Sequence, residues 1–209
     1  MLKYIVYSLY MYIAHRINSS AMANSLPEDY GIEFDLRESE KSIIVTHDPF
    51  TYGEDFEYFL SNLKIKRFLI VNVKGEGFEE KVLGLLKKYK FEDFFFLDCS
   101  FPAIIKLSKL GEKRIAMRFS EYESIETIEL NKDRIQWVWV DCFTTFPLTK
   151  NIEKQIHSMG LKICIVSPEL QSHGKDIEPY GKYIRKEFIK INAICTKEYN
   201  VLQWEKLFD

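Results

Sequence analysis

Two dipeptides near the start of the chain, His15-Arg16 and His47-Asp48, place a proton-transfer group beside a charged neighbour. Imidazole has an ordinary pKa close to neutrality, so it can act as a general acid or a general base. The two dipeptides hold half of the four histidines in the chain. Their residue types therefore predict a site for acid–base chemistry in this part of the sequence.

The segment between the dipeptides carries charges that suit a cation and a phosphate. Residues 32–37 alternate apolar and charged side chains, which is the periodicity of a β-strand. Side chains two apart on a strand point to the same face, so Glu33, Asp35 and Arg37 share one face. Carboxylates bind hard cations, and a guanidinium binds phosphate oxygens. The segment therefore predicts a combined cation and phosphate site on one strand.

Length and composition predict one folded domain over residues 1–209. The 209 residues are 46% hydrophobic and 15% aromatic, which is enough for a packed core. The formal net charge is −2, so no basic surface for DNA or RNA is expected. The sequence leaves the oligomeric state open.

The cysteines are Cys99, Cys142, Cys164 and Cys195, and each lies in or at the end of an apolar run. No two of them have the CxxC spacing of a zinc site. We expect reduced, buried thiols that act as small core residues.

The apolar segment of residues 1–14 resembles the hydrophobic part of a signal peptide, but its context favours a core strand. It is too short to cross a membrane as a helix. Cleavage near Ala14 would leave His15 at a new terminus and remove the strand that should hold it. We therefore expect a cytoplasmic protein without a membrane span, in which residues 1–10 form an irregular extension.

Strand-like and helix-like segments alternate along the rest of the chain. The predicted strands are Tyr12–Arg16, Ile32–Arg37, Phe68–Lys74, Asp93–Asp98, Arg114–Phe119, Gln136–Cys142, Lys162–Val166 and Ala193–Thr196, with a short extended piece at Ser42–His47. The predicted helices are Glu54–Leu63, Phe78–Tyr89, Pro102–Leu110, Asn151–Met159 and Tyr199–Phe208. Ser120 and Glu123 have the capping-box pattern of a further helix start, and little helix is expected in residues 17–31.

This alternation predicts the α/β class and a compact, single-domain (β/α)8 TIM-like barrel with parallel strands. An open doubly wound sheet is the alternative. In a barrel the active site lies where the strands end. Besides the residues above, the strand ends hold Asn72, Lys74, Asp98, Arg118, Asp141, Glu169, Thr196 and Lys197. We expect the charged side chains to share one pocket, with Trp137 and Trp139 filling the interior below it.

The ordered motifs resemble those of the glycerophosphodiester phosphodiesterases, in the phospholipase C-like phosphodiesterase superfamily. The family pattern has His-Arg-Gly after the first strand, Glu-x-Asp on the second, His-Asp next, and a carboxylate two residues before a lysine at the end of the third. The matching positions here are His15-Arg16, Glu33-x-Asp35, His47-Asp48 and Asn72-Val73-Lys74. The match covers residues 15–74, and the later strands agree only in their alternation with helices.

Three departures make this chain a divergent member of the family it resembles. Ile17 replaces the motif glycine, and Asn72 stands at the position of the third metal-binding carboxylate. The helix that normally follows the first motif, with a Glu-Asn-Thr signature, is missing. These elements surround the phosphate and the leaving group in the family, so the substrate is left open.

The resemblance implies a phosphoric diester hydrolase that acts on a small phosphodiester. The implied roles are catalytic for His15 and His47, phosphate-binding for Arg16 and Lys74, and metal-binding for Glu33, Asp35 and Asn72. A donor set made only of oxygens suits Mg²⁺ or Ca²⁺, and the neutral amide implies weak binding. Which histidine is the acid and which is the base stays open.

Two other functions are compatible with the same residues. A phosphate-ligand-binding protein on the same barrel would keep the pocket and lose turnover, and Asn72 favours this alternative. An isomerase or lyase acting on a phosphorylated sugar would use the same fold for a different reaction.

Overall fold

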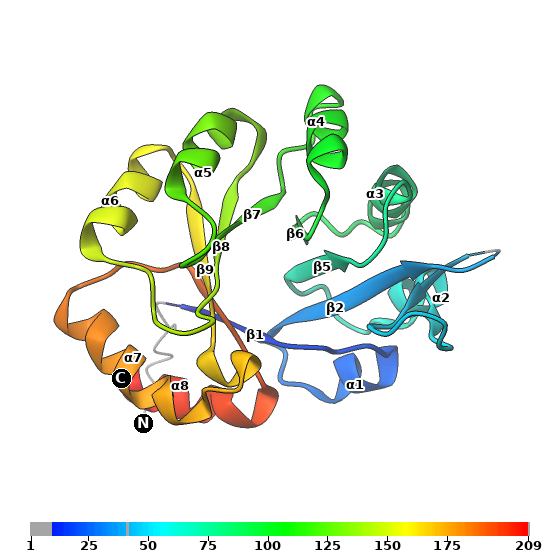
Figure 1. Ribbon diagram of the computed structural model, residues 1–209. Helices are drawn as coiled ribbons and strands as arrows, with labels where there is room; N and C mark the ends of the chain where they lie inside the picture. Colours follow the sequence, from blue (N-terminus) through cyan, green and yellow to red (C-terminus); the bar gives the residue numbers. More distant parts are fainter. Residues whose placement is uncertain (1–9, 41, 209) are drawn as a thin grey trace, which may run out of the picture.

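The computed structural model describes residues 10–40 and 42–208, and within them strands and helices alternate from beginning to end (Figure 1). The predicted extension over residues 1–10 lies outside the described residues, apart from Tyr10. No helix in the described ranges is long and apolar enough to cross a lipid bilayer.

The described strands match the eight predicted ones and add a short hairpin. They are β1 Met11–Ala14, β2 Gly31–Glu38, β3 Ile43–Val45, β4 Glu54–Asp55, β5 Leu69–Val73, β6 Phe94–Leu97, β7 Ala116–Phe119, β8 Trp137–Val140, β9 Lys162–Val166 and β10 Ala193–Thr196. β3 and β4 pair antiparallel with each other, and β3 pairs antiparallel with the end of β2. The other eight strands run parallel to their neighbours.

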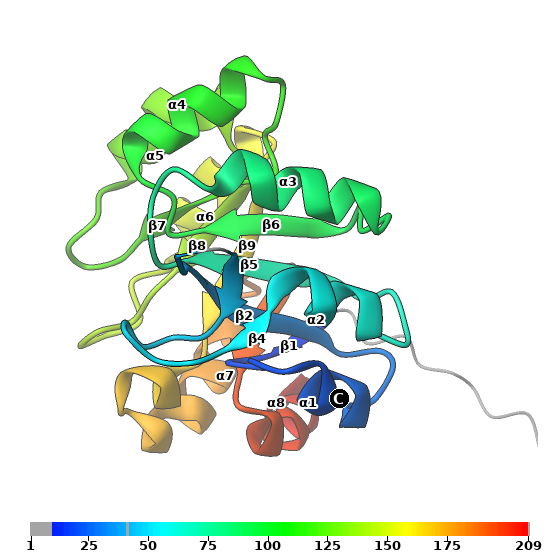
Figure 2. The same ribbon diagram turned by 90° about the vertical axis from the view of Figure 1, so that its right-hand side faces the viewer.

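The helices lie outside the strands (Figure 1), and Figure 2 shows α2, α3 and α4 following one another on one side. They are α1 Ser20–Ser25, α2 Phe56–Asn62, α3 Glu79–Lys88, α4 Phe101–Lys109, α5 Ile125–Asn131, α6 Lys150–Ser158, α7 Ile177–Lys186 and α8 Val201–Phe208. Short 3-10 helices cover Lys132–Arg134, Pro168–Gln171, Gly174–Asp176 and Glu198–Asn200.

Three helix predictions need correction. Residues 17–31 were expected to hold little helix and to lack the helix that follows the first motif, but α1 lies there, begun by Ser19, whose Oγ accepts from the Met22 amide at 3.2 Å. Ser120 does not begin a helix, because its Oγ donates to Glu123 Oε2 at 2.7 Å within a turn and α5 starts only after Ser124. Helix α7 was not predicted, since its first turn contains Pro179 and its middle contains Gly181. The glycine is required by packing: a Cβ at that position would lie 2.7 Å from Leu207 Cδ1 of α8.

The order of the parallel strands follows the chain, as the barrel prediction requires. β1 pairs with β2, β2 with β5 and β5 with β6, while β7, β8, β9 and β10 pair in sequence and β10 returns to β1. In the described residues β6 and β7 are linked by one isolated bridge, between Phe96 and Ile115. Near that bridge the Phe96 amide donates to the Arg114 carbonyl at 2.8 Å. The protein is therefore of the α/β class with a mainly parallel sheet. Among the described residues, β6 and β7 are paired by a single bridge, whereas the other neighbouring strands are each paired over two or more residues.

Alternation along each strand divides the core into two parts. On β6, Phe94 and Phe96 belong to the large cluster that includes residues of the surrounding helices. Phe95 and Leu97 belong to a second, smaller cluster with Trp137 and other strand residues. Successive side chains on a strand point to opposite faces, so the second cluster lies on the face of the sheet away from the helices, which we call the interior.

The interior confirms the expected role of the tryptophans. Trp137 and Trp139 are 3% and 4% exposed and lie in the interior cluster. The Phe95 ring centroid lies 4.9 Å from that of Trp137 and 6.4 Å from that of Trp139. These rings fill the interior, and the polar residues at the strand ends lie above them. The buried Cys142, Cys164 and Cys195 also act as small core residues, and Cys99 is half-buried.

Phe95→Ala should destabilise the fold by about 3–5 kcal/mol, because it removes a fully buried ring between two tryptophans. Urea unfolding followed by tryptophan fluorescence measures this loss. Phe101→Ala is the matched control, since Phe101 is 50% exposed and its loss should change stability little. Equal midpoints for Phe95→Ala and the wild type would contradict the account of the interior.

Candidate functional site

Strand β2 turns two carboxylates into the interior at the end where the parallel strands finish. Its alternate residues Ile32, Phe34 and Leu36 belong to the helix-facing core. Glu33 and Asp35 therefore point inward, and they are 0% and 1% exposed. Two acids of the same sign are thus buried side by side, and their surroundings must compensate for the charge.

Glu33 is held by three neighbours, two of which follow β1 and one of which lies on β5. The Arg16 backbone amide donates to Oε2 at 2.7 Å, and Asn72 Nδ2 donates to Oε1 at 2.8 Å. His15 Nε2 lies 3.6 Å from Oε2. Burial, reinforced by the charge of Asp35, raises the pKa of Glu33 to about 7. The site therefore contains a carboxyl group whose pKa lies near neutrality.

Asp35 is braced by Asn18 and by two cations. Its carboxylate accepts from Asn18 Nδ2 at 3.0 Å, while its backbone amide donates to Asn18 Oδ1 at 2.9 Å. Lys74 Nζ lies 3.7 Å from Oδ1, and Arg16 Nε lies 4.0 Å from Oδ2. Asn18 thus fixes both the backbone and the side chain of Asp35.

The β2–β3 hairpin returns His47 to this end of the sheet. The Thr46 amide donates to the Asp35 carbonyl at 2.9 Å. Arg37 Nε donates to the His47 carbonyl at 2.8 Å, and Arg37 Nη1 donates to the Lys74 carbonyl at 2.8 Å. Arg37 therefore contacts backbone instead of facing a phosphate as the strand pattern suggested. Its role is to hold the backbone at two residues of the site.

His47 has a carboxylate beside one ring nitrogen and a guanidinium beside the other. Nδ1 lies 2.7 Å from Asp48 Oδ1, and Nε2 lies 2.7 Å from Arg16 Nη2. A guanidinium only donates and a carboxylate only accepts. His47 therefore carries its proton on Nδ1 and presents an Nε2 lone pair toward Arg16.

His15 has a different environment. Its Nδ1 lies 3.0 Å from Lys197 Nζ, and its backbone amide donates to the Thr196 carbonyl at 2.9 Å. Burial lowers the pKa of His15 to about 3, with further contributions from Lys197 and Arg16. The ring is therefore neutral at neutral pH.

Salt bridges continue from Asp35 across four more strands. Lys74 Nζ lies 3.0 Å from Asp98 Oδ2, and Arg118 Nε donates to Asp98 Oδ1 at 2.8 Å. Arg118 Nη1 also pairs with Asp141. We call Asp35, Lys74, Asp98, Arg118 and Asp141 the charge chain. It alternates in sign and joins the ends of β2, β5, β6, β7 and β8.

Asp141 is the last member of the charge chain and accepts hydrogen bonds from two further donors. Trp139 Nε1 donates to Oδ2 at 3.1 Å, and Gln171 Nε2 donates to Oδ1 at 2.9 Å. Burial raises the pKa of Asp141, while Arg118 opposes that rise. Asp141 is therefore an anion that depends on its partners.

Glu169 lies at the same end but does not join the charge chain. It accepts from Thr196 Oγ1 at 2.5 Å and from the Lys197 amide at 3.0 Å. Ser167 Oγ also donates to it. These bonds tie the segment after β9 to the end of β10, so the geometry gives Glu169 a bracing contact.

The structure thus brings together the principal residues named from the sequence. His15, Arg16, Glu33, Asp35, His47, Asn72 and Lys74 are connected by the contacts above, and Asp98, Arg118 and Asp141 extend them. Arg16 and Asp98 also have left-handed backbones, with φ of 58° and 61°. Non-glycine residues adopt this region rarely and often at functional sites.

Sequence reasoning missed two contributors. Asn18 lies in residues 17–31, where little helix was expected, and nothing in its local pattern indicates a contact with Asp35. Lys197 was located at a strand end but given no role. The alternation of the strand could have indicated its direction. Ala193 and Cys195 face the interior, so Lys197, two residues after Cys195, faces the same way.

The donor atoms fit a hard cation in type. Glu33, Asp35 and Asn72 offer only oxygen, and Asn72 Oδ1 is buried without a hydrogen-bond partner. In residues 10–40 and 42–208 no group of three or more His, Cys, Asp or Glu residues is arranged to hold a metal. A cation here would therefore depend on the amide oxygen as its third protein ligand.

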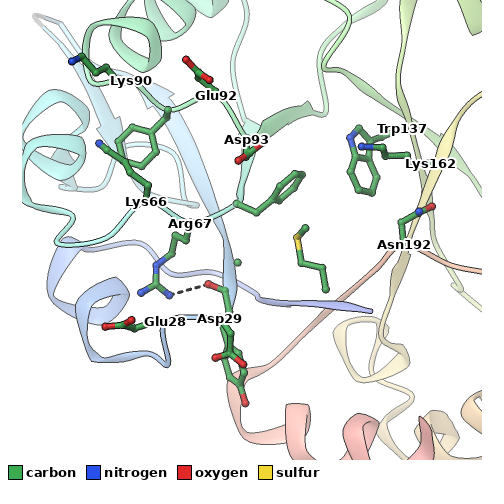
Figure 3. A pocket seen from close by; sticks show the side chains of 15 residues that line it. Glu28, Asp29, Lys66, Arg67, Lys90, Glu92, Asp93, Trp137, Lys162 and Asn192 are labelled. Carbon is green, nitrogen blue, oxygen red and sulfur yellow. Dashed lines mark hydrogen bonds between the residues drawn. The ribbon is translucent and has the colours of Figure 1, made fainter. Parts of the chain in front are cut away.

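A cavity of about 620 Å³ lies at the other end of the strands (Figure 3). It is lined by strand starts such as Gly31 and Trp137, and none of the predicted site residues lines it. Arg67 Nη1 donates to the Pro27 and Tyr30 carbonyls at 3.1 and 2.9 Å. Lys66 Nζ donates to the Tyr89 carbonyl at 2.7 Å. These cations hold backbone at this end.

Comparison with solved structures gives close matches over nearly the whole chain. A candidate glycerophosphoryl diester phosphodiesterase from Agrobacterium tumefaciens has a TM-score of 0.70 at 13% identity, covering 95% of this chain and 98% of that chain. One from Parabacteroides distasonis has a TM-score of 0.66 at 14% identity, with coverages of 96% and 88%. The chain has the glycerophosphodiester phosphodiesterase fold.

A third match with this fold was solved with a bound product. It is an Oleispira antarctica phosphodiesterase in complex with sn-glycerol-3-phosphate, with a TM-score of 0.64 at 13% identity and coverages of 95% and 97%. No protein-family model matches the chain. No curated protein matches it either. The glycerophosphodiester phosphodiesterase fold is therefore shared with these structures at low sequence identity.

Arg118→Met should destabilise the protein by about 3–5 kcal/mol at neutral pH, because it leaves the buried Asp141 without its cation. Without Arg118 the pKa of Asp141 should rise further, and ionised Asp141 then disfavours the folded state. The deficit relative to the wild type should therefore be smaller at acid pH and grow as pH rises through the raised pKa. Denaturant unfolding at several pH values measures it.

The double variant Arg118→Met, Asp141→Asn is the control. It removes the unpaired charge, so it should recover much of the stability at neutral pH. A pH-independent deficit that the double variant fails to reduce would contradict the charge chain.

Proposed function

We propose that this chain hydrolyses a small phosphodiester at the site built on Glu33 and Asp35, as a divergent relative of the glycerophosphodiester phosphodiesterases. The supporting observation is that the four family-like motifs, in family order, make direct side-chain contacts at one end of a shared fold. Within this set His15 contacts Glu33, and Arg16 contacts both Asp35 and His47.

Glu33, Asp35 and Asn72 would hold a divalent cation, with Mg²⁺ or Ca²⁺ preferred by an all-oxygen set. Such a cation, when bound, offsets the negative charge of the phosphodiester. The unpartnered Asn72 Oδ1 supports this assignment, since a buried polar atom without a partner is costly. A neutral third donor predicts weak affinity.

Arg16 and Lys74 would bind the phosphate. The Arg16 side chain is 45% exposed, so it can meet a ligand from solvent. Lys74 is held between Asp35 and Asp98, so its ammonium group is already positioned before a ligand binds. A guanidinium can engage two phosphate oxygens at once, whereas the lysine acts as a point charge.

His47 would take the proton of the attacking group and pass it to the leaving alkoxide, and His15 would donate a hydrogen bond. His47 carries the Asp48-oriented Nδ1–H and an Nε2 lone pair, which suits a base that accepts a proton from the attacking hydroxyl group. Phosphate binding to Arg16 would release that lone pair. His15 stays neutral and lies beside Glu33, which suits a donor to the developing charge.

A glycerophosphodiester is the first substrate to test. The phosphodiesterase from Oleispira antarctica binds sn-glycerol-3-phosphate as its product. Hydrolysis of a glycerophosphodiester gives such a phosphomonoester and a free alcohol. We also propose that the strands form a complete (β/α)8 barrel through the β6–β7 bridge, and that the protein acts in the cytoplasm.

A binding protein without turnover is the second candidate, favoured by the amide at position 72. Incubation of the chain with a panel of glycerophosphodiesters and phosphomonoesters, with Mg²⁺, Ca²⁺ or Mn²⁺, separates the candidates. Release of alcohol from a diester supports hydrolysis. Ligand binding without release supports the second candidate, and rearrangement of a sugar phosphate without release supports an isomerase or lyase.

His47→Ala and His15→Ala should each lower turnover by about 10²- to 10⁴-fold, because the first removes the proton-transfer group and the second removes the hydrogen-bond donor to the developing charge. Steady-state kinetics on the best diester of the panel measure the loss. His157→Ala is the control, since His157 binds the Leu161 and Lys190 carbonyls away from the site. Activity within a few-fold of the wild type would remove that histidine from the mechanism.

Asn72→Asp should tighten the binding of Mg²⁺ and Ca²⁺, because a third carboxylate adds a full charge to the donor set. The wild type should bind at millimolar concentrations, and Glu33→Gln or Asp35→Asn should abolish binding. Isothermal titration calorimetry measures all four proteins. No binding by the wild type at tens of millimolar, together with none gained by Asn72→Asp, would contradict the metal assignment.

A further inference from the structure

Lys197 makes a contact that neither the motifs nor the comparisons assign. It follows β10, and its backbone amide is fixed by Glu169 Oε1 at 3.0 Å. Its side chain reaches His15, where Nζ lies 3.0 Å from Nδ1. No ion pair joins Lys197 to a carboxylate in the part of the chain that the structure describes. Its partner is therefore an imidazole.

The contact determines where His15 carries its proton. An ammonium group has three donors and no acceptor, so His15 Nδ1 must be the acceptor. A neutral imidazole has one N–H, which then resides on Nε2. That nitrogen is the one 3.6 Å from Glu33 Oε2. The lone pair of His15 thus faces Lys197, and its N–H faces the carboxylate.

The two histidines of the site are consequently in opposite tautomers. His47 has its proton on Nδ1, where Asp48 accepts, and Arg16 occupies its Nε2 lone pair. His15 has the reverse arrangement, because its Nδ1 faces the Lys197 ammonium, whereas the Nδ1 of His47 faces the Asp48 carboxylate. His47 can accept a proton at its Nε2. His15 can only donate a hydrogen bond from its Nε2.

We propose that Lys197 is a positioning residue that holds His15 in the Nε2–H tautomer, so that this ring serves the reaction as a hydrogen-bond donor. The proposal rests on the proposed function for its catalytic meaning, but the tautomer is a property of the chain alone. Lys197 acts through His15 and does not itself contact the reacting atoms.

The tautomer can be read directly by ¹⁵N NMR of the imidazole rings in the protein without metal or substrate. The wild type should show a pyridine-type Nδ1 and a pyrrole-type Nε2 for His15, with His15→Gln assigning the signals. Lys197→Met should give a mixture of tautomers, and Lys197→Arg should keep the wild-type pattern because arginine also only donates. Lys64→Met is the matched control, since Lys64 is exposed and away from the site.

Kinetics supply the second readout. Lys197→Met should lower kcat by about 10- to 100-fold with little change in KM, the range typical of a residue that orients a site group, and Lys197→Arg should restore it. A wild-type His15 with its proton on Nδ1, or a tautomer unchanged in Lys197→Met, overturns the proposal. So does a rise in KM with kcat unchanged, which would make Lys197 a substrate-binding cation. If no phosphodiester is turned over, the proposed function fails while the NMR result still decides the tautomer.

Discussion

Burying two carboxylates two residues apart on one strand is costly unless donors and cations surround both of them. Glu33 and Asp35 of β2 have partners in the segment between β1 and β2 and partners on or directly after β5. Removing such partners would leave a charge in the interior. Because each partner must reach the same point, the ends of several strands are fixed relative to one another. The site and the fold are stabilised by the same contacts at this end.

The same constraint explains the local irregularities. Arg16 adopts a left-handed backbone and donates its amide to Glu33, while its side chain reaches Asp35 and His47. The β2–β3 hairpin brings His47 back to Arg16, which contacts both carboxylates. Charge then alternates outward along the charge chain, so that the two buried acids in it, Asp35 and Asp141, each contact a cation. Below this layer the interior is aromatic and aliphatic, which separates the site from the charged residues at the other end of the strands.

Much of this arrangement could be predicted from sequence because it follows periodicity. Alternation at residues 32–37 placed Glu33 and Asp35 on one face, and the apolar runs located all eight parallel strands. Order along the chain then predicted the convergence of His15, His47 and Lys74. Contacts made by loops and by backbone groups were not predictable. Asn18 and Arg37 act through backbone atoms whose positions depend on the folded chain, and α7 was hidden by a proline and a glycine whose use depends on packing against α8.

The central claim is that the carboxylate pair on β2 forms the centre of a phosphodiester-hydrolysing site. The most direct test is ³¹P NMR of a glycerophosphodiester mixed with the protein and Mg²⁺ or Ca²⁺. The account predicts that the diester resonance is replaced by a phosphomonoester resonance with the wild type and persists with Glu33→Gln. A diester that persists with the wild type across both metals, or that is converted equally by Glu33→Gln, would contradict it.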